Sequence, residues 1–236
     1  MKKVSVVIPV YNGANYLARA IESVLEQDYP NIELTVCDGE STDNTSKIAE
    51  QYGVRVVQGK LHLMPNWNAA IQSADGDYVK LLCHDDTLKK DCVKKQAEIL
   101  DANPEVMLVS CQRQYIDGSG NELPTPQPIP RTVRLTGKEA SLLMLQYGNI
   151  IGETSCTMFR NGGLVFPETL NWLLDMWLWM KLFAKGDLHY IGEPLANIRK
   201  HPDQDTYRVL RDPEYGRKET SDKQHLMNIY RQAYAA

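Results

Sequence analysis

Short runs of apolar, β-branched residues alternate with segments of helical periodicity through the first half of the chain. Each run suits a strand that is buried on both faces, and helices between such strands require right-handed crossovers. The expected strands are 4–9, 32–38, 54–57, 77–83 and 105–111. The expected helices are 16–25, 44–51, 66–73 and 88–103, the last of them capped by Thr87. The pattern predicts an α/β fold in which helices sandwich a mostly parallel sheet.

The second half has a less regular pattern. Residues 118–130 contain two glycines and four prolines, which is typical of a loop. We place a subdomain boundary near this loop and predict one continuous domain with the parts 1–112, 113–200 and 201–236. Further helices are expected at 138–146, 170–184 and 221–234, and further strands at 155–159 and 188–191.

Composition narrows the classes of partner. A chain of 236 residues can bury about 70% of its surface, so it needs no disulfide or metal to fold. Its 26 Lys and Arg against 30 Asp and Glu give a net charge of −4, which argues against nucleic acid. Five cysteines with no CxxC pair, and no signal peptide, predict reduced thiols in a cytoplasmic protein. The longest apolar stretch of the second half, 172–183, is too short to span a bilayer, so we expect any membrane contact to be peripheral.

Acidic residues follow two of the expected parallel strands. Asp38 ends the second strand, and Asp85 and Asp86 follow the fourth. The carboxyl ends of parallel strands meet at one rim of the sheet, where ligands bind. Carboxylates gathered there repel one another unless a cation lies among them, so the pattern favours a divalent metal with an oxygen-rich ligand. The alternative is local: Asp38 begins a turn, and Asp85 and Asp86 lead into a helix cap.

Three blocks in the first half are similar, in sequence and in order, to a known family. They are VSVVIPVYN, VCDGESTDNT and NWNAAIQSADGDYVKLLCHDD. They resemble the N-terminal signature of family 2 glycosyltransferases, which have the GT-A fold. The resemblance implies a nucleotide-sugar site in which Pro9, Tyr11, Asn12 and Asp38 hold the nucleoside, and we add Asn68 of the third block to this site.

In that family, an Asp-x-Asp element after the fourth strand holds the ribose and a divalent cation, Mn²⁺ or Mg²⁺, on the diphosphate. The element falls on residues 83–85, where Cys83 replaces its first Asp, and Gly39 replaces an Asp of the earlier motif. A thiol does not substitute for a carboxylate on a hard cation. We therefore expect Asp85 and Asp86 to bind the metal, and we add His201 as a third ligand.

The segment LLDMWLWMKLFAKGDLHYIGEPLANIRKHPDQDT (173–206) extends the resemblance into the second half. There the family has an acidic residue at the start of an aromatic-rich helix, then a strand and an Arg-x-His. The match implies that Asp175 is the catalytic base and that Arg199 and His201 lie near the diphosphate, with Arg199 part of the nucleotide-sugar site. Simpler interpretations stay open: Asp175 as a carboxylate of the first helical turn, the tryptophans as packing, and His201 as a solvated loop residue.

These residues suit transfer of a sugar from a nucleoside diphosphate, because a cation stabilises the leaving diphosphate and one carboxylate takes the proton of the acceptor hydroxyl. The resemblance implies an inverting glycosyltransferase with a UDP-sugar donor and a glycan or lipid-linked saccharide acceptor, in polysaccharide or glycolipid synthesis. Residues 1–112 would bind the donor, and 113–200 would bind the acceptor and carry the base. Peripheral contact with the inner membrane face is left open, and the oligomeric state is not indicated.

Other classes of function are less consistent with the sequence. The chain lacks a GxGxxG after its first strand and lacks a phosphate loop, which disfavours dinucleotide oxidoreductases and NTPases. The alternative from a different class, motivated by Gly39 and Cys83, is a degenerate glycosyltransferase-like protein that binds a sugar nucleotide or a partner without turnover.

Overall fold

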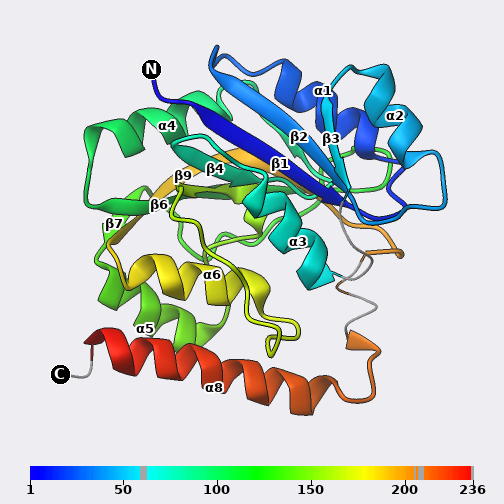
Figure 1. The fold of residues 1–236 in the computed structure, drawn as a ribbon. Helices are drawn as coiled ribbons and strands as arrows, with labels where there is room; N and C mark the ends of the chain where they lie inside the picture. Colours follow the sequence, from blue (N-terminus) through cyan, green and yellow to red (C-terminus); the bar gives the residue numbers. More distant parts are fainter. Residues whose placement is uncertain (59–62, 205, 207–209, 235–236) are drawn as a thin grey trace.

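The computed structural model describes residues 1–58, 63–204, 206 and 210–234. Within these residues nine strands form one sheet, in the order β3-β2-β1-β4-β8-β6-β9-β5 with β7 beside β9 (Figure 1). The strands are β1 (Val4–Val10), β2 (Ile32–Asp38), β3 (Arg55–Gln58), β4 (Tyr78–Leu81), β5 (Thr87–Leu88), β6 (Val106–Ile116), β7 (Val133–Leu135), β8 (Thr157–Arg160) and β9 (Asp187–Arg199). The helices are α1 (Leu17–Leu25), α2 (Thr45–Gln51), α3 (Leu63–Gln72), α4 (Cys92–Ala102), α5 (Gly137–Tyr147), the 3-10 helix η1 (Thr154–Cys156), α6 (Leu174–Phe183) and α8 (Tyr215–Tyr234).

Strand β1 lies at the centre of the first half of the sheet. It pairs in parallel with β2 on one side and β4 on the other, and all seven of its residues are buried. Its side chains alternate between the two faces, with Val6 and Ile8 in one core and Val7 in the other. The carbonyl of Val7 accepts the N–H of Leu82 on the β4 side. The nitrogen of Pro9 faces the same side beyond the end of β4, so its missing N–H interrupts no ladder.

Helices cover both faces of the sheet, as Figure 1 shows. Helices α1, α2 and α4 pack on the face that Val6 and Ile8 enter, and α3, α5, α6 and α8 pack on the face that Val7 enters. Each face therefore has its own apolar core, and together they confirm the predicted layers of helix, sheet and helix.

The second half of the chain completes the same sheet. Strand β8 lies antiparallel between β4 and β6, and β9 runs parallel to β6 over most of its length. Short strands β5 and β7 pair antiparallel with β9. The prediction of a mostly parallel sheet is confirmed. The proline-rich segment 118–130 connects β6 to β7, both of which belong to this sheet, and the division into subdomains stays a prediction.

Several predicted boundaries were wrong because distant segments pair with them. Thr87 does not cap a helix: residues Thr87–Leu88 form β5 opposite Asn197 and Ala196 of β9, and α4 begins at Cys92. The strand expected at 188–191 extends over Asp187–Arg199, since β9 pairs with β6, β7 and β5. Among the described residues, no helix combines the length and apolar character needed to span a membrane.

Candidate active site

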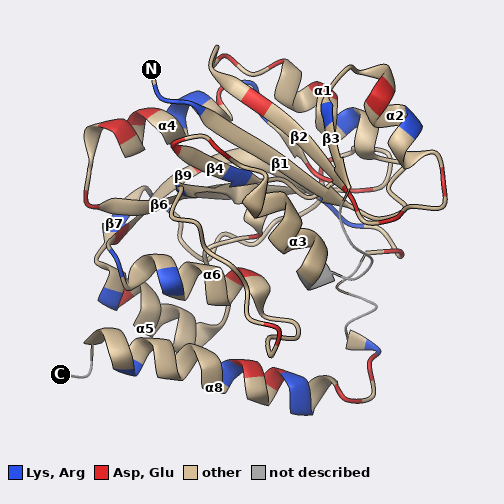
Figure 2. Ribbon diagram, viewed as in Figure 1, with Lys and Arg blue, Asp and Glu red and all other residues tan. Residues whose placement is uncertain are grey.

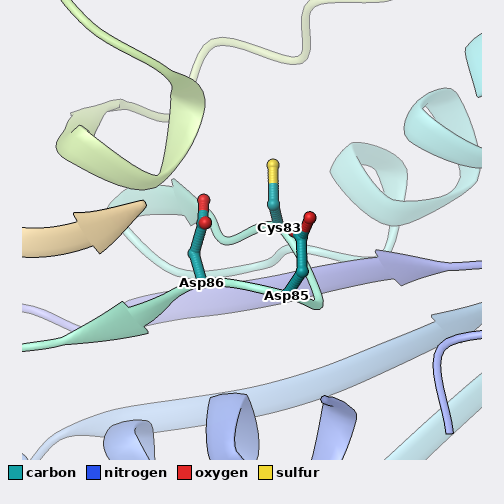
Figure 3. A group of neighbouring side chains, drawn as sticks. All are labelled: Cys83, Asp85 and Asp86. Carbon is teal, nitrogen blue, oxygen red and sulfur yellow. The ribbon is translucent and has the colours of Figure 1, made fainter. Parts of the chain in front are cut away.

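A tight turn directly after β4 brings three side chains together at the carboxyl end of the sheet. The Sγ of Cys83 and one carboxylate oxygen each of Asp85 and Asp86 lie within 4.8 Å of one another. Figure 3 shows the three side chains rising to the same side of the chain. The N–H of Asp86 donates to the carbonyl of Cys83 (3.2 Å) and closes the turn. We call residues 83–86 the carboxylate turn.

Asp85 contacts Arg199, the last residue of β9, and His201, which follows that strand. Its Oδ2 is 3.1 Å from Nε2 of His201, and its carbonyl accepts the Nε–H of Arg199 (2.8 Å). Burial alone would raise the pKa of Asp85, but the hydrogen bond with His201 and the charge of His84 outweigh it and hold that pKa below its ordinary value. Asp85 is therefore an ionised carboxylate that is 9% exposed at the rim.

Asp86 has a different environment although it is the next residue. Its Oδ1 accepts the backbone N–H of Arg199 (2.9 Å), and its Oδ2 accepts the hydroxyl of Ser155 (2.6 Å). Burial, and then the charge of Asp85, raises the pKa of Asp86 well above its ordinary value. The two oxygens of Asp86 thus tie the carboxylate turn to β9 and η1, which indicates an anchoring role.

Cys83 takes the place of a carboxylate in this turn. Its N–H donates to the hydroxyl of Ser155 (3.0 Å), and its thiol lies 3.5 Å from Oγ1 of Thr154. Burial, and then the charges of Asp86 and Asp85, raises the pKa of Cys83 well above its ordinary value. The thiol is therefore protonated at neutral pH, and a neutral, soft sulfur does not bind a hard cation.

The remaining donors suit a divalent cation that a substrate helps to hold. The Oδ2 of Asp85 and the Nε2 of His201 are 3.1 Å apart, close to the roughly 3 Å between adjacent ligands of an octahedral ion with bonds of about 2.1 Å. Mg²⁺ commonly takes one or two carboxylates and completes its shell with phosphate oxygens and water. Asp85 would bind such an ion through Oδ2, and His201 would bind it through Nε2 in place of the hydrogen bond between the two side chains.

A second polar cluster lies where β1 and β2 end. The Oδ1 of Asp38 accepts the N–H of Ser41 (3.0 Å), and its Oδ2 accepts the hydroxyl of Ser46. Asn12 has a φ of 51°, a left-handed conformation that Asn tolerates. Its N–H donates to Oγ of Ser41 (2.8 Å), and its Oδ1 accepts the N–H of Thr42 (2.8 Å). These bonds join the loops after β1 and β2 into one surface.

The other residues predicted for the nucleoside site lie at different places. Pro9 is buried within β1, and Tyr11, which is 38% exposed, follows the end of that strand. Asn66 reaches this end of the sheet, since its Nδ2 donates to the last carbonyl of β1 (3.1 Å). The amide of Asn68 makes two hydrogen bonds with the backbone of Phe166, at 2.8 and 3.1 Å. Asn66 therefore bonds the end of β1, whereas these two bonds of Asn68 are with the backbone of Phe166.

The loop after β1 connects the two clusters. A Cβ on Gly13 would lie 2.6 Å from the ring of His84, so this close approach requires glycine. The ring of Tyr16 lies 4.8 Å from the ring of His201, and the guanidinium of Arg199 lies 4.8 Å from the ring of Tyr16. The carboxylate turn and the second polar cluster, around Asn12 and Asp38, are therefore neighbours along the rim.

Asp175 lies in the first turn of α6 and is partly exposed. Its Oδ2 accepts Nδ2–H of Asn149 (2.6 Å), and its Oδ1 accepts the N–H of Met176 (2.7 Å). Burial raises the pKa of Asp175 to about 6, with the charge of Glu153 adding to the rise and the two hydrogen bonds opposing it. Such a carboxylate is ionised at neutral pH and accepts a proton more readily than an ordinary Asp.

The segment 149–155 connects Asp175 to the carboxylate turn. Asn149, at its start, holds Asp175, and Ser155, at its end, holds Asp86. Between them, the charge of Glu153 raises the pKa of both Asp86 and Asp175. The structure thus gathers Asp85, Asp86, Arg199 and His201 directly and brings Asp175 to the same region through this segment.

Three polar residues of this region, Asn66, Asn149 and Ser155, were not predicted as site residues. Each bonds a partner far along the chain, 26 positions away for Asn149 and 69 for Ser155. No local pattern marks such long-range contacts. Asn66 alone had a signal in the sequence, because it stands in the third of the family-like blocks.

Comparisons with known proteins agree with this architecture. The model of the family described as glycosyl transferase family 2 matches residues 5–164. An uncharacterised glycosyltransferase of Rickettsia prowazekii is 34% identical over 215 residues, which cover 88% of this chain and 67% of that relative. The poly(ribitol-phosphate) beta-N-acetylglucosaminyltransferase TarS of Staphylococcus aureus is 27% identical over 238 residues, covering 89% of this chain and 40% of TarS.

A solved structure shows the same fold. The crystal structure of S. aureus TarS 1–349 in complex with UDP-GlcNAc superposes with a TM-score of 0.71 at 20% identity, covering 98% of this chain and 73% of that one. The architecture is therefore the GT-A fold that the resemblance implied. From the family match across most of the chain and the related sequences, we conclude that the protein belongs to glycosyl transferase family 2, a family of sugar-transferring enzymes.

Proposed function

We propose that this protein transfers a sugar from a UDP-sugar to a hydroxyl of a glycan acceptor, with inversion at the anomeric carbon. The observation that carries the proposal is the convergence of ionised Asp85 with His201 and Arg199 at the carboxyl end of the sheet. A second carboxylate, Asp175, has a raised pKa and lies along the segment that anchors the same turn. A cation-binding carboxylate and a separate proton acceptor are the two groups that this reaction needs.

The donor is proposed from the arrangement of the two clusters. The nucleoside would lie against Tyr11, Asn12 and Asp38, and the diphosphate would lie at the carboxylate turn near Arg199. The structural neighbour TarS 1–349 was solved with UDP-GlcNAc, which supports a uridine nucleotide. When bound by Asp85 and His201, Mn²⁺ or Mg²⁺ would neutralise charge that develops on the departing diphosphate.

The chemistry of transfer assigns a role to Asp175. The acceptor oxygen forms a bond to the anomeric carbon while the bond between that carbon and the diphosphate oxygen breaks. UDP leaves with the bonding electron pair, and Asp175 takes the proton of the acceptor hydroxyl. Asn149 and the N–H of Met176 each use one acceptor site on the carboxylate, so lone pairs remain for the proton. One displacement inverts the anomeric centre and requires no protein nucleophile.

The acceptor is proposed at the level of its class. The name of TarS gives poly(ribitol-phosphate) as the acceptor of that protein. For this chain we propose a glycan or lipid-linked saccharide in polysaccharide or glycolipid synthesis, bound mainly by residues 113–200. A lipid-linked acceptor would bring the enzyme to the inner membrane face.

Incubation with a panel of UDP-sugars and saccharide acceptors, with Mn²⁺, Mg²⁺ or EDTA, tests this function. We expect UDP release and a glycosylated product whose anomeric configuration, read by NMR, is opposite to that of the donor. Cation-dependent donor binding without turnover across the panel would instead favour the degenerate, non-catalytic relative that Cys83 and Gly39 suggest. Retention of configuration would contradict the assignment of a single displacement.

A further inference from the structure

A carboxylate from the C-terminal helix lies at the start of α6. Asp222 of α8 is fully buried. Its carboxylate accepts the backbone N–H groups of Asn171 (3.0 Å), Trp172 (2.6 Å) and Leu173 (3.0 Å), and also Nδ2–H of Asn171 (2.9 Å). Three consecutive N–H groups thus point at one side chain that lies about 50 positions further along the chain.

This arrangement supplies what α6 lacks locally. The N-cap residue of α6 is Leu173, and no side chain caps the helix from that position. The first N–H groups of a helix need acceptors and carry partial positive charge, so a carboxylate is favoured there. Asp222 accepts the N–H of this N-cap residue from outside the helix, and the N–H groups of Asn171 and Trp172 that it also accepts lie just before the helix. Asp175 follows Leu173 by two residues. The segment that Asp222 holds therefore leads directly into the helical turn that carries the Asp175 side chain.

Helix α8 is joined to this region by more than one contact. It runs alongside α5 and α6 (Figure 1), and its Leu226 and Ile229 enter the apolar core that α6 also lines. The ammonium of Lys218 lies 5.2 Å from the ring of Trp172. Figure 2 shows that the charged residues of α8 concentrate in its N-terminal half; among them Asp222 is buried, whereas Arg217 and Lys223 are exposed.

We propose that Asp222 is a positioning residue for sugar transfer: by holding residues 171–173, it directs the Asp175 carboxylate toward the acceptor hydroxyl. The inference rests on the proposed role of Asp175 as the base. By this inference, α8 contributes a residue on which sugar transfer depends. Within the described parts of the chain, the Asp222 carboxylate bonds residues 171–173 before α6 and bonds no residue of the carboxylate turn.

The test is a comparison of Asp222→Asn with the wild type in steady-state assays. Asn keeps the shape but loses the charge and one acceptor oxygen, so we expect kcat to fall about 10- to 100-fold, as misplacement of a reacting group does. The KM for the UDP-sugar should stay within about twofold of the wild-type value, because the residues proposed to bind it lie at the ends of the strands and not on α8. Glu219→Gln is the matched control, since Glu219 lies on α8 and pairs with Lys223 (3.0 Å); its kcat should equal that of the wild type.

A double-mutant cycle with Asp175→Asn separates positioning from general loss of structure. If Asp222 acts through Asp175, adding Asp222→Asn to Asp175→Asn lowers kcat no further. Full additivity, or a wild-type kcat in folded Asp222→Asn, overturns the inference while leaving the base role intact. Near-normal turnover of Asp175→Asn alone would refute the proposed base and the inference with it. Should Asp222→Asn be unfolded at the assay temperature, Asp222→Glu, which keeps the charge but shifts the carboxylate, replaces it in the same cycle with the same criteria.

Discussion

The carboxylate turn at 83–86 and the start of α6 at 171–175 each bring a carboxylate to the same end of the sheet, but they are held differently. In the carboxylate turn, the supports come from strand β9 and the 3-10 helix η1 directly before β8: Ser155 of η1 bonds the N–H of Cys83, and the backbone of Arg199 of β9 bonds Asp86. At the start of α6, the supports are side chains of other helices and loops, Asp222 of α8 and Asn149.

The difference separates two tasks. Hydrogen bonds from β9 and η1 hold the carboxylate turn, which suits its proposed role in binding the donor diphosphate. At the start of α6, the proposed proton acceptor, Asp175, depends on Asn149 and, through residues 171–173, on Asp222 of α8. We therefore expect changes in the first region to act on donor affinity and changes in the second to act on turnover.

The largest effect is expected in the second region. Asp175→Asn removes the proposed proton acceptor while keeping the size of the side chain, so kcat should fall by about 10²- to 10⁴-fold. Donor affinity, measured by calorimetry with UDP and Mn²⁺, should stay near that of the wild type. A kcat within about threefold of the wild-type value would contradict the role of Asp175 as the base. The proposed division of tasks between the two regions would then fail.

A smaller effect is expected from the carboxylate turn. Asp85→Ala removes one of the two proposed protein ligands, so the affinity for UDP in the presence of Mn²⁺ should fall about 10- to 100-fold. EDTA should weaken UDP binding by the wild type to a similar level and should have little effect on the variant. Equal UDP affinity of the variant and the wild type in Mn²⁺ would show that the cation does not bind through Asp85.

The pH dependence of kcat tests the second region without a mutation. A general base acts in its ionised form, and burial raises the pKa of Asp175, the proposed base, to about 6. At saturating donor, kcat should be constant at neutral pH and should fall about tenfold for each pH unit below the pKa. Asn149→Ala removes a hydrogen bond that lowers this pKa, so the acidic limb should move to higher pH. An acidic limb that stays in place in Asn149→Ala would contradict the contact as a determinant of the pKa.

The smallest effect is expected at Asp86, directly beside Asp85. Because burial raises its pKa, a neutral amide of the same shape is a close replacement, and the Ser155 hydroxyl can rotate to suit it. Asp86→Asn should change UDP affinity in Mn²⁺ by no more than about threefold, or roughly 0.7 kcal/mol. A loss as large as that of Asp85→Ala would assign Asp86 to the cation and end the contrast between the two neighbours.

Prediction from the sequence worked best where chemistry follows directly from strand order. The run 4–9 predicted a parallel strand buried on both faces, and the acidic residues that follow β2 and β4 indicated a polar rim, because parallel strands end on the same side. It failed where distant pairing overrides local preference. Thr87 has a good capping side chain, yet its backbone pairs with Asn197, 110 positions away.

The amino-acid sequence by itself determined the layered α/β architecture, the family and the residue types available for chemistry, since periodicity and motif order are local properties. Tertiary structure alone decided that Asp85 is ionised while Asp86 anchors the turn, that Asn66 bonds the end of β1, and that Asp222 holds the segment just before α6. The reason is physical: the pKa of a carboxyl group and the direction of its hydrogen bonds depend on neighbours that only folding brings within a few ångströms.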